Sequence, residues 1–258
     1  MKFIDTHAHI YLEQFKKDIA DVVERSIENG VEKIYLPNID HTSIDDMLEL
    51  EHKFPGVCFP MMGLHPCSVD NDFEKQLYIA EDWIGKRDFN GIGEIGTDLY
   101  WDKTFWEQQQ EALKIQLGWA REKKWPAILH CRESIDETIG IVKEMKHTDL
   151  RGIFHCFTGT VEQAEEIINL GFYLGIGGVS TFKNGGLEEV LEKVDLAHMV
   201  LETDSPYLAP VPFRGKRNEP SRIPLIADRI AILKNIEVEQ VGEITSQNAI
   251  KIFESDAI

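Results

Sequence analysis

Short apolar runs rich in valine, isoleucine and phenylalanine alternate along the chain with longer segments whose apolar positions recur every three or four residues. The short runs predict eight strands, at residues 3–7, 32–37, 57–63, 90–94, 127–130, 152–155, 172–176 and 199–202. The longer segments predict nine helices, at about residues 18–29, 43–53, 72–85, 104–123, 133–146, 161–170, 187–194, 224–235 and 239–253. Each strand is followed by a helix, and the last helix is additional to that alternation.

This alternation predicts an α/β fold, a (β/α)8 TIM barrel with an additional C-terminal helix, built as one domain over residues 1–258. A doubly wound open sheet is the alternative, and it usually carries a glycine-rich phosphate loop after its first strand. Here the first strand leads into His7-Ala8-His9 instead. The barrel is therefore the preferred prediction.

The net charge of −18 argues against broad electrostatic binding to a polyanion, which needs a basic face. Any nucleic-acid chemistry would have to draw its affinity from metal ions and a local basic patch. No apolar run is long enough to span a bilayer, so no membrane partner is expected. The four irregularly spaced cysteines favour free thiols, and we expect a cytoplasmic protein that is a monomer or a weak oligomer.

Imidazole and carboxylate side chains stand at six of the eight predicted strand ends, where a barrel places its functional residues. His7 and His9 are two residues apart on an extended strand, so both side chains can point to one side. The remaining strand-end groups are His65, Glu94, His130, His155 and Asp204. Five of the nine histidines share this position, whereas His41, His52, His147 and His198 do not and are interpreted as solvated or structural.

Mixed imidazole and carboxylate ligands without thiolate suit Zn, Mn, Ni or Fe and are compatible with a Mg-bound working form. Candidate ligands at six strand ends are too many for one tetrahedral ion and fit two divalent ions that share a bridging carboxylate. Glu94 is the natural bridge because a carboxylate has two oxygens. Asp204 is expected to bind a metal and to take the proton from a nucleophilic water. Cys131 and Cys156 are interpreted as packing residues on the opposite face.

A basic loop follows the eighth predicted strand, with four basic residues against one acidic residue over residues 213–222. A solvated loop is the simpler interpretation, but its place beside the predicted metals favours phosphate binding by Arg214, Lys216 and Arg217. Arg132, two residues past His130, is a further candidate for contact with a phosphate or with transition-state charge.

At these residues the chain resembles the TatD-type metal-dependent deoxyribonucleases, a branch of the amidohydrolase-like barrels. The matching pieces run nearly end to end in order: Phe3-Ile4-Asp5-Thr6-His7-Ala8-His9, Gly63-Leu64-His65-Pro66, Gly93-Glu94-Ile95-Gly96, His130-Cys131-Arg132, His155-Cys156-Phe157-Thr158-Gly159, Glu202-Thr203-Asp204-Ser205-Pro206-Tyr207-Leu208, Asn218-Glu219-Pro220 and Asn248-Ala249. The resemblance implies metal-dependent hydrolysis of DNA phosphodiester bonds, exonucleolytic in the 3′–5′ direction, on single strands.

Carried onto these positions, the resemblance implies one set of metal ligands, namely His7, His9, Glu94, His130, His155 and Asp204. It also implies that His65 contacts a substrate phosphate or assists the leaving group. Glu202 would support a ligand from behind or orient a water. Thr97 departs from the family, which usually has leucine there, and Asp98 is expected either to shape the site or to cap the segment that follows it.

Two other functions remain open from the sequence. One is a related barrel hydrolase that acts on a C–N or C–O bond of a small molecule, which would suit the acidic surface. Such enzymes often bridge their metals with a modified lysine, and Glu94 at the fourth strand end counts against this alternative. The other is a metal-binding scaffold without turnover, which the full set of candidate ligands disfavours.

Overall fold

A computed structural model describes residues 2–146 and 149–254. Within these ranges, eight parallel strands run in chain order: β1 (Phe3–Asp5), β2 (Val31–Pro37), β3 (Cys58–Met61), β4 (Ile92–Asp98), β5 (Ala127–Arg132), β6 (Gly152–Phe154), β7 (Phe172–Ile176) and β8 (Met199–Leu201). The α-helices are α1 (Ile19–Glu28), α2 (Ile44–Lys53), α3 (Phe73–Lys86), α4 (Trp106–Lys123), α5 (Ile135–Glu144), α6 (Val161–Asn169), α7 (Glu188–Lys193), α8 (Ile223–Lys234) and α9 (Val238–Phe253). Short 3₁₀ turns, which the sequence pattern did not predict, lie at Glu13–Phe15, Pro66–Ser68, Gly178–Thr181, Leu196–His198 and Pro220–Arg222.

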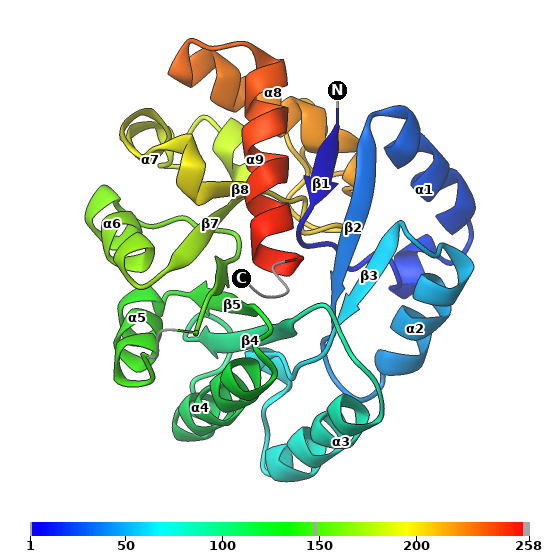
Figure 1. The fold of residues 1–258 in the computed structure, drawn as a ribbon, viewed down its shortest axis with the longest axis vertical. Coiled ribbons are helices and arrows are strands. Elements are labelled where there is room, and N and C mark those ends of the chain that lie inside the picture. The colour runs from blue at the N-terminus through cyan, green and yellow to red at the C-terminus, as the bar shows by residue number, and fades with distance from the viewer. Residues whose placement is uncertain (1, 147–148, 255–258) are drawn as a thin grey trace.

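The strands form a closed barrel, with β1-β2-β3 and β4-β5-β6-β7-β8 as its two continuous parts. Isolated parallel bridges join the parts at both seams, Met62 to Ile92 and Ala8 to Ser205. At the second seam the Thr6 amide donates to the Leu201 carbonyl oxygen at 3.0 Å. Figure 1 shows the helices arranged around this ring of strands. The predicted (β/α)8 barrel with an additional C-terminal helix is confirmed.

Strand ends differ from the prediction where the chain turns into the barrel mouth. β1, β6 and β8 are three residues long and end before His7, His155 and Glu202, because the backbone departs from the extended conformation there. Cys156 and Asp204 have positive φ angles of 46° and 54°, which lie outside the β region. His7, His155 and Glu202 therefore lie on short turns just past the strands, whereas Glu94 and His130 lie within β4 and β5.

Helix α9 covers the N-terminal end of the barrel, where Figure 1 shows it crossing in front of the strands. Its residues Ala249, Ile252 and Phe253 pack with inward-facing side chains of six strands, namely Ile4, Tyr35, Met61, Ile128, Ile153 and Val200. The rings of Tyr35 and Phe253 stack with centroids 3.6 Å apart. The barrel interior is therefore packed and closed at this end, and the polar residues gather at the other.

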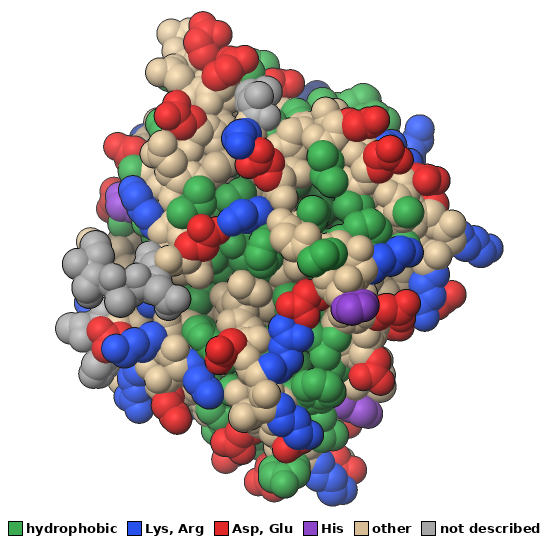
Figure 2. Space-filling model, turned by 45° about the vertical axis from the view of Figure 1, so that its right-hand side comes forward, with side chains coloured by type: hydrophobic (Ala, Val, Ile, Leu, Met, Phe, Trp, Pro, Cys, Tyr) green, Lys and Arg blue, Asp and Glu red, His purple; other side chains and the backbone are tan. Residues whose placement is uncertain are grey.

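The surface carries charges of both signs. Figure 2 shows acidic and basic side chains interspersed over one face, with hydrophobic patches between them. All four cysteines are free thiols, in agreement with their irregular spacing. In the described ranges, no helix has the length and apolar character that crossing a membrane requires.

Candidate metal centre

Glu94 lies at the centre of the barrel mouth, on β4, with only 2% of its surface exposed. Its Oε2 atom lies 3.1 Å from His7 Nε2 and 3.2 Å from His9 Nε2. The Oδ1 atom of Asp204 lies 3.8 Å and 3.7 Å from the same two nitrogens. His7, His9 and Glu94 thus form one group of ligand atoms able to surround an ion.

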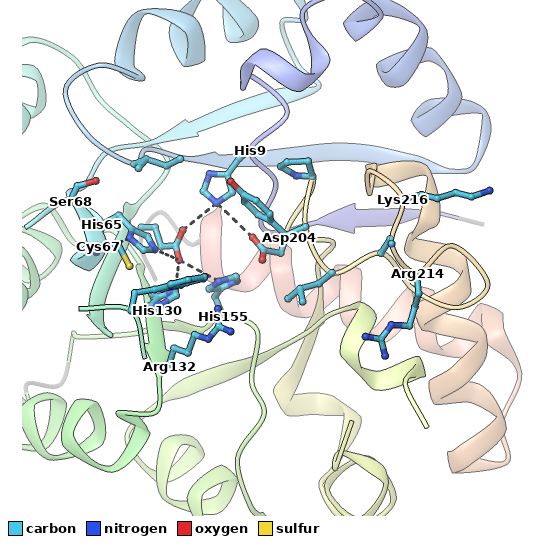
Figure 3. Close-up of a pocket in the computed structure, with 18 of the residues that line it drawn as sticks. His9, His65, Cys67, Ser68, His130, Arg132, His155, Asp204, Arg214 and Lys216 are labelled. Atoms are coloured by element: carbon cyan, nitrogen blue, oxygen red, sulfur yellow. Dashed lines mark hydrogen bonds and ion pairs between the residues drawn. The ribbon is translucent and has the colours of Figure 1, made fainter. Parts of the chain in front are cut away.

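The other oxygen of Glu94 faces a different set of imidazoles. Oε1 lies 2.9 Å from His130 Nδ1 and 3.3 Å from both His65 Nε2 and His155 Nε2. Figure 3 shows His65, His130 and His155 grouped together, with His9 apart from them. Burial alone would raise the pKa of Glu94, but the surrounding imidazoles hold it well below its ordinary value. Glu94 is therefore an ionised carboxylate with one oxygen toward each set.

The buried polar atoms of this centre fit a bound cation. His7 Nε2 and His9 Nε2 face each other at 3.1 Å, although both nitrogens also approach the same carboxylate oxygen. Burial and the neighbouring His155 hold the pKa of His7 well below its ordinary value, so its ring is neutral. Among the described residues, His7 Nδ1 has no hydrogen-bond partner. The lone pairs of these nitrogens and of the Glu94 oxygen point toward one another, with too few protons for each contact to be a hydrogen bond. A divalent ion bound between them would accept these lone pairs.

Tyr11 fixes which nitrogen of His9 is available. The Tyr11 hydroxyl donates to the Pro37 carbonyl oxygen at 2.5 Å, because a carbonyl can only accept. It must then accept from His9 Nδ1, which lies 2.9 Å away. The proton of a neutral His9 is therefore on Nδ1, and Nε2 is left as a ligand atom.

Replacing Tyr11 with phenylalanine is expected to weaken metal binding about 10-fold, because the hydroxyl that selects the His9 tautomer is removed. Metal affinity is measured by competition with a chromogenic chelator. Tyr35→Phe, a buried change at the opposite end of the barrel, is the matched control and should leave the affinity unchanged. Equal affinities for the two variants would contradict this assignment.

Asp98 performs both of the roles between which the sequence left a choice. Its Oδ1 accepts from the amides of Tyr100 and Trp101, and so caps the segment that follows β4. Its Oδ2 lies 2.9 Å from His130 Nε2 and fixes that ring with Nδ1 toward Glu94. Burial would raise the pKa of Asp98, but the hydrogen bond from His130 and the two amides lower it to about 2.

Glu202 supports His155 from beneath the site. Its Oε1 accepts from the Cys156 amide at 2.6 Å and lies 3.0 Å from His155 Nδ1, which leaves His155 Nε2 facing Glu94. A side chain at Gly175 would place its Cβ 2.2 Å from Glu202 Oε2, so the fully buried carboxylate requires glycine on β7. The implied role of Glu202 as support for a ligand agrees with these contacts.

His65 is arranged as a donor. Its Nδ1 accepts from the Cys67 amide at 3.0 Å, so the proton of the neutral ring is on Nε2, the atom that faces Glu94. A protonated nitrogen cannot ligate a metal. His65 therefore differs from His130 and His155, although all three contact the same carboxylate oxygen.

Asp5 and Thr203 are residues that the sequence analysis missed as part of the site. Asp5 accepts from the amides of His7 and Thr203 and, at 2.5 Å, from the Thr203 hydroxyl, so it ties the ends of β1 and β8 together. Burial raises the pKa of Asp5 to about 8. Burial also raises the pKa of Asp204, to about 6. Alternation along the first strand could have identified Asp5 and Tyr11, because both are two residues from a histidine of the pair.

The departure at Thr97 is accommodated by neighbouring hydroxyl groups. Thr97 Oγ1 lies 2.8 Å from Ser134 Oγ and 2.7 Å from Thr138 Oγ1. Ser134 donates in turn to the Thr97 carbonyl oxygen, and Thr138 donates to that of Ser134. The polar residue is thus satisfied between β4 and α5 and does not contact the metal centre.

A pocket of about 820 Å³ opens above the metal centre. Of the predicted substrate-binding residues, the structure places four in its lining, namely His65, Arg132, Arg214 and Lys216. Arg217 is the exception. It forms a two-pronged ion pair with Asp18 at 2.6 and 2.8 Å and stacks on Phe15, away from the pocket. Arg214 and Lys216 of the basic loop therefore line the pocket, whereas Arg217 packs on the exterior of the barrel. The prediction that Arg217 binds substrate phosphate is corrected.

The histidines outside the predicted set lie apart from these contacts where they can be placed. His52 is in the last turn of α2, His198 precedes β8, and His41 contacts Gln76. His147 lies outside the described residues. Three of these four interpretations thus agree with the structure.

A family model, curated relatives and a solved structure all match this chain over nearly its whole length. The family described as TatD related DNase matches residues 4–254. The chain is 36% identical to the uncharacterized metal-dependent hydrolase YabD of Bacillus subtilis, over 96% of this chain and 98% of that protein. It is 33% identical to the corresponding hydrolase YcfH of Escherichia coli K12, over 100% and 97%. The crystal structure of the TatD homologue YjjV of E. coli superposes with a TM-score of 0.92 at 28% identity, over 98% of both chains.

Proposed function

The chain belongs to the family of TatD related DNases, and from this premise we propose that it is a metal-dependent hydrolase of DNA phosphodiester bonds that uses two divalent ions. We further propose that it removes nucleotides from single strands in the 3′–5′ direction. The observation that carries the two-ion proposal is the division of the histidines between the two oxygens of Glu94.

In this proposal His7, His9 and Glu94 Oε2 would hold one ion, with Asp204 beside it. Glu94 Oε1, His130 Nδ1 and His155 Nε2 would hold the second ion. Bound divalent ions would supply charge stabilisation for the phosphoryl oxygens and a lowered pKa for the attacking water.

The protein's own groups then act on the attacking water and on the departing oxygen. In this proposal Asp204 accepts the proton of the attacking water, and His65 Nε2–H donates a hydrogen bond that stabilises the negative charge developing on the departing oxygen, which takes its proton from solvent. Arg132 and Arg214 both line the pocket, at separate positions in Figure 3, and would offer guanidinium N–H groups to the substrate's phosphates.

The test is hydrolysis of end-labelled single-stranded DNA by the purified protein supplied with Mg²⁺, Mn²⁺ or Zn²⁺. We expect a ladder that shortens from the 3′ end and stops on addition of a chelator. A 3′-terminal phosphorothioate should slow the reaction, whereas the same group at the 5′ end should not. Turnover of amides or lactones without any cleavage of DNA would overturn the proposal.

Replacing His65 with alanine is expected to lower kcat about 10²-fold with metal content unchanged, because the side chain donates a hydrogen bond to the departing oxygen and does not ligate. Steady-state kinetics and metal analysis of the same preparation check this. A p-nitrophenolate leaving group carries its negative charge without that hydrogen bond, so the variant should cleave such a substrate nearly as fast as the wild type. Loss of metal from this variant would contradict the assignment.

A further inference from the structure

Two aromatic side chains are exposed at the rim of the pocket, directly after β4. Trp101 is 68% exposed and Tyr100 is 47% exposed, and their rings meet edge to face with centroids 4.9 Å apart. Trp101 also lines the pocket above the metal centre. Large apolar rings left open to solvent beside an active site are typical of a binding surface.

Arg132 is stacked on these rings. Its guanidinium carbon lies 3.8 Å from the Tyr100 ring centroid and 5.3 Å from that of Trp101. Stacking restrains the guanidinium plane but uses none of its N–H groups, which remain available at the edges for a phosphate. We call Tyr100, Trp101 and Arg132 the aromatic platform.

The aromatic platform is held in a fixed relation to the metal centre by one carboxylate. The amides of Tyr100 and Trp101 donate to Asp98 Oδ1 at 2.8 and 2.9 Å. The other oxygen, Oδ2, lies 2.9 Å from His130 Nε2. A ligand that stacks on the platform is therefore positioned relative to the histidine that faces Glu94.

We propose that the aromatic platform binds one unpaired nucleobase of the substrate, next to the phosphodiester that is cleaved. This rests on the nucleic-acid hydrolysis proposed above and specifies how a single strand is selected. Because the protein carries a net charge of −18, affinity from phosphate contacts alone is opposed over much of its surface. Stacking on aromatic rings supplies affinity without net charge, and it requires a base that is not already stacked within a duplex.

Only one side of the scissile bond should depend on the platform. Elsewhere in the pocket lining Arg214 stacks on Phe182, with its guanidinium carbon 3.8 Å from the ring centroid. The oxygens of Asp98 bond instead to the Tyr100 and Trp101 amides and to His130. The base bound beside Arg132 is thus the one whose position is fixed relative to the metal ligands. Removal of a base should therefore weaken binding at a single nucleotide position of the strand.

The test compares Trp101→Ala with Tyr78→Ala, a control on α3 that is 69% exposed and lies outside the pocket. Binding of a fluorescein-labelled oligodeoxythymidine of about eight nucleotides is measured by anisotropy, with Ca²⁺ supplied to slow cleavage. We expect Trp101→Ala to weaken binding roughly 5- to 100-fold and Tyr78→Ala to have no effect. Trp101→Phe, which keeps a stacking ring, should restore most of the affinity.

A second measurement localises the base. Abasic residues are placed one at a time along the strand, and we expect one position to weaken binding to the wild type but not to Trp101→Ala. Equal binding by Trp101→Ala and the wild type, or an abasic penalty that persists in the variant, would overturn the platform while leaving DNA cleavage intact. Binding that depends on Trp101 without cleavage of any DNA would support the platform and reject the proposed hydrolysis.

Discussion

Glutamine in place of Glu94 is expected to lower kcat for DNA cleavage at least about 10³-fold and to reduce bound metal from two ions to one or none per chain. The amide has the shape of the carboxylate but lacks its charge, and its NH₂ group would point at ligand nitrogens on one side. The expected loss of kcat exceeds the ~10- to 100-fold loss of activity that follows removal of a residue that only hydrogen-bonds to a metal ligand. Single-turnover kinetics and elemental analysis of the purified variant measure both effects.

Glu51→Gln is the matched control for this change. Glu51 is an ion-paired carboxylate that contacts Arg87 through both oxygens at 2.7 Å, outside the pocket. We expect this variant to keep its metal content and to retain kcat within about 2-fold, as changes away from a functional site usually do. A Glu94→Gln protein that folds, holds two ions and cleaves DNA at near wild-type rate would contradict the proposal that Glu94 bridges the two ions.

Removal of metal by a chelator is expected to lower the melting temperature by roughly 5–10 °C. A ligand present at 100 times its Kd stabilises the folded state by ~2.7 kcal/mol, and each kcal/mol corresponds to ~2–4 °C for a chain of this size. The convergence of His7, His9 and Glu94, with too few protons between their buried atoms, is the physical reason. Differential scanning calorimetry of the metal-free protein, with metal added back, measures the shift.

The size of the shift should depend on pH, because imidazole ligands must lose their protons to bind metal. Burial lowers the pKa of His155, but the charges of Glu202 and Glu94 raise it well above the ordinary value of ~6.5, and Asp98 and Glu94 likewise raise the pKa of His130. The stabilisation by added metal is therefore expected to be fully present at high pH and to shrink as the pH falls through these raised pKa values. The same titration with Glu94→Gln controls for metal bound elsewhere. A metal-induced rise of the same size in that variant would place the stabilising ion outside this centre.

The barrel and the gathering of its ligands could be predicted because both follow from the order of elements. Parallel strands that alternate with helices bring their C-terminal ends to one face of the barrel. A histidine at one of these ends is therefore placed beside residues far away in sequence, as His7 is beside Glu94 and His155. The position of a residue within its strand was enough to predict its neighbours.

The protonation of each ligand and the direction of each arginine could not be predicted in this way. His65 and His155 look alike in the sequence, and they differ because one ring accepts from a backbone amide while the other donates to Glu202. Arg217 stands among the basic residues of one loop, yet Asp18, 199 residues away, determines where it points. These outcomes depend on atomic contacts between distant segments, which periodicity does not encode.

The packed end of the barrel beneath α9 also limits the route that a polymer can follow. Because Ala249, Ile252 and Phe253 close the floor of the barrel, a strand that descends to Glu94 must turn and come back out on the side from which it arrived. For the nucleic-acid hydrolysis proposed above, the substrate would therefore enter and leave at the barrel mouth, and a route that threads a long strand through the barrel is closed.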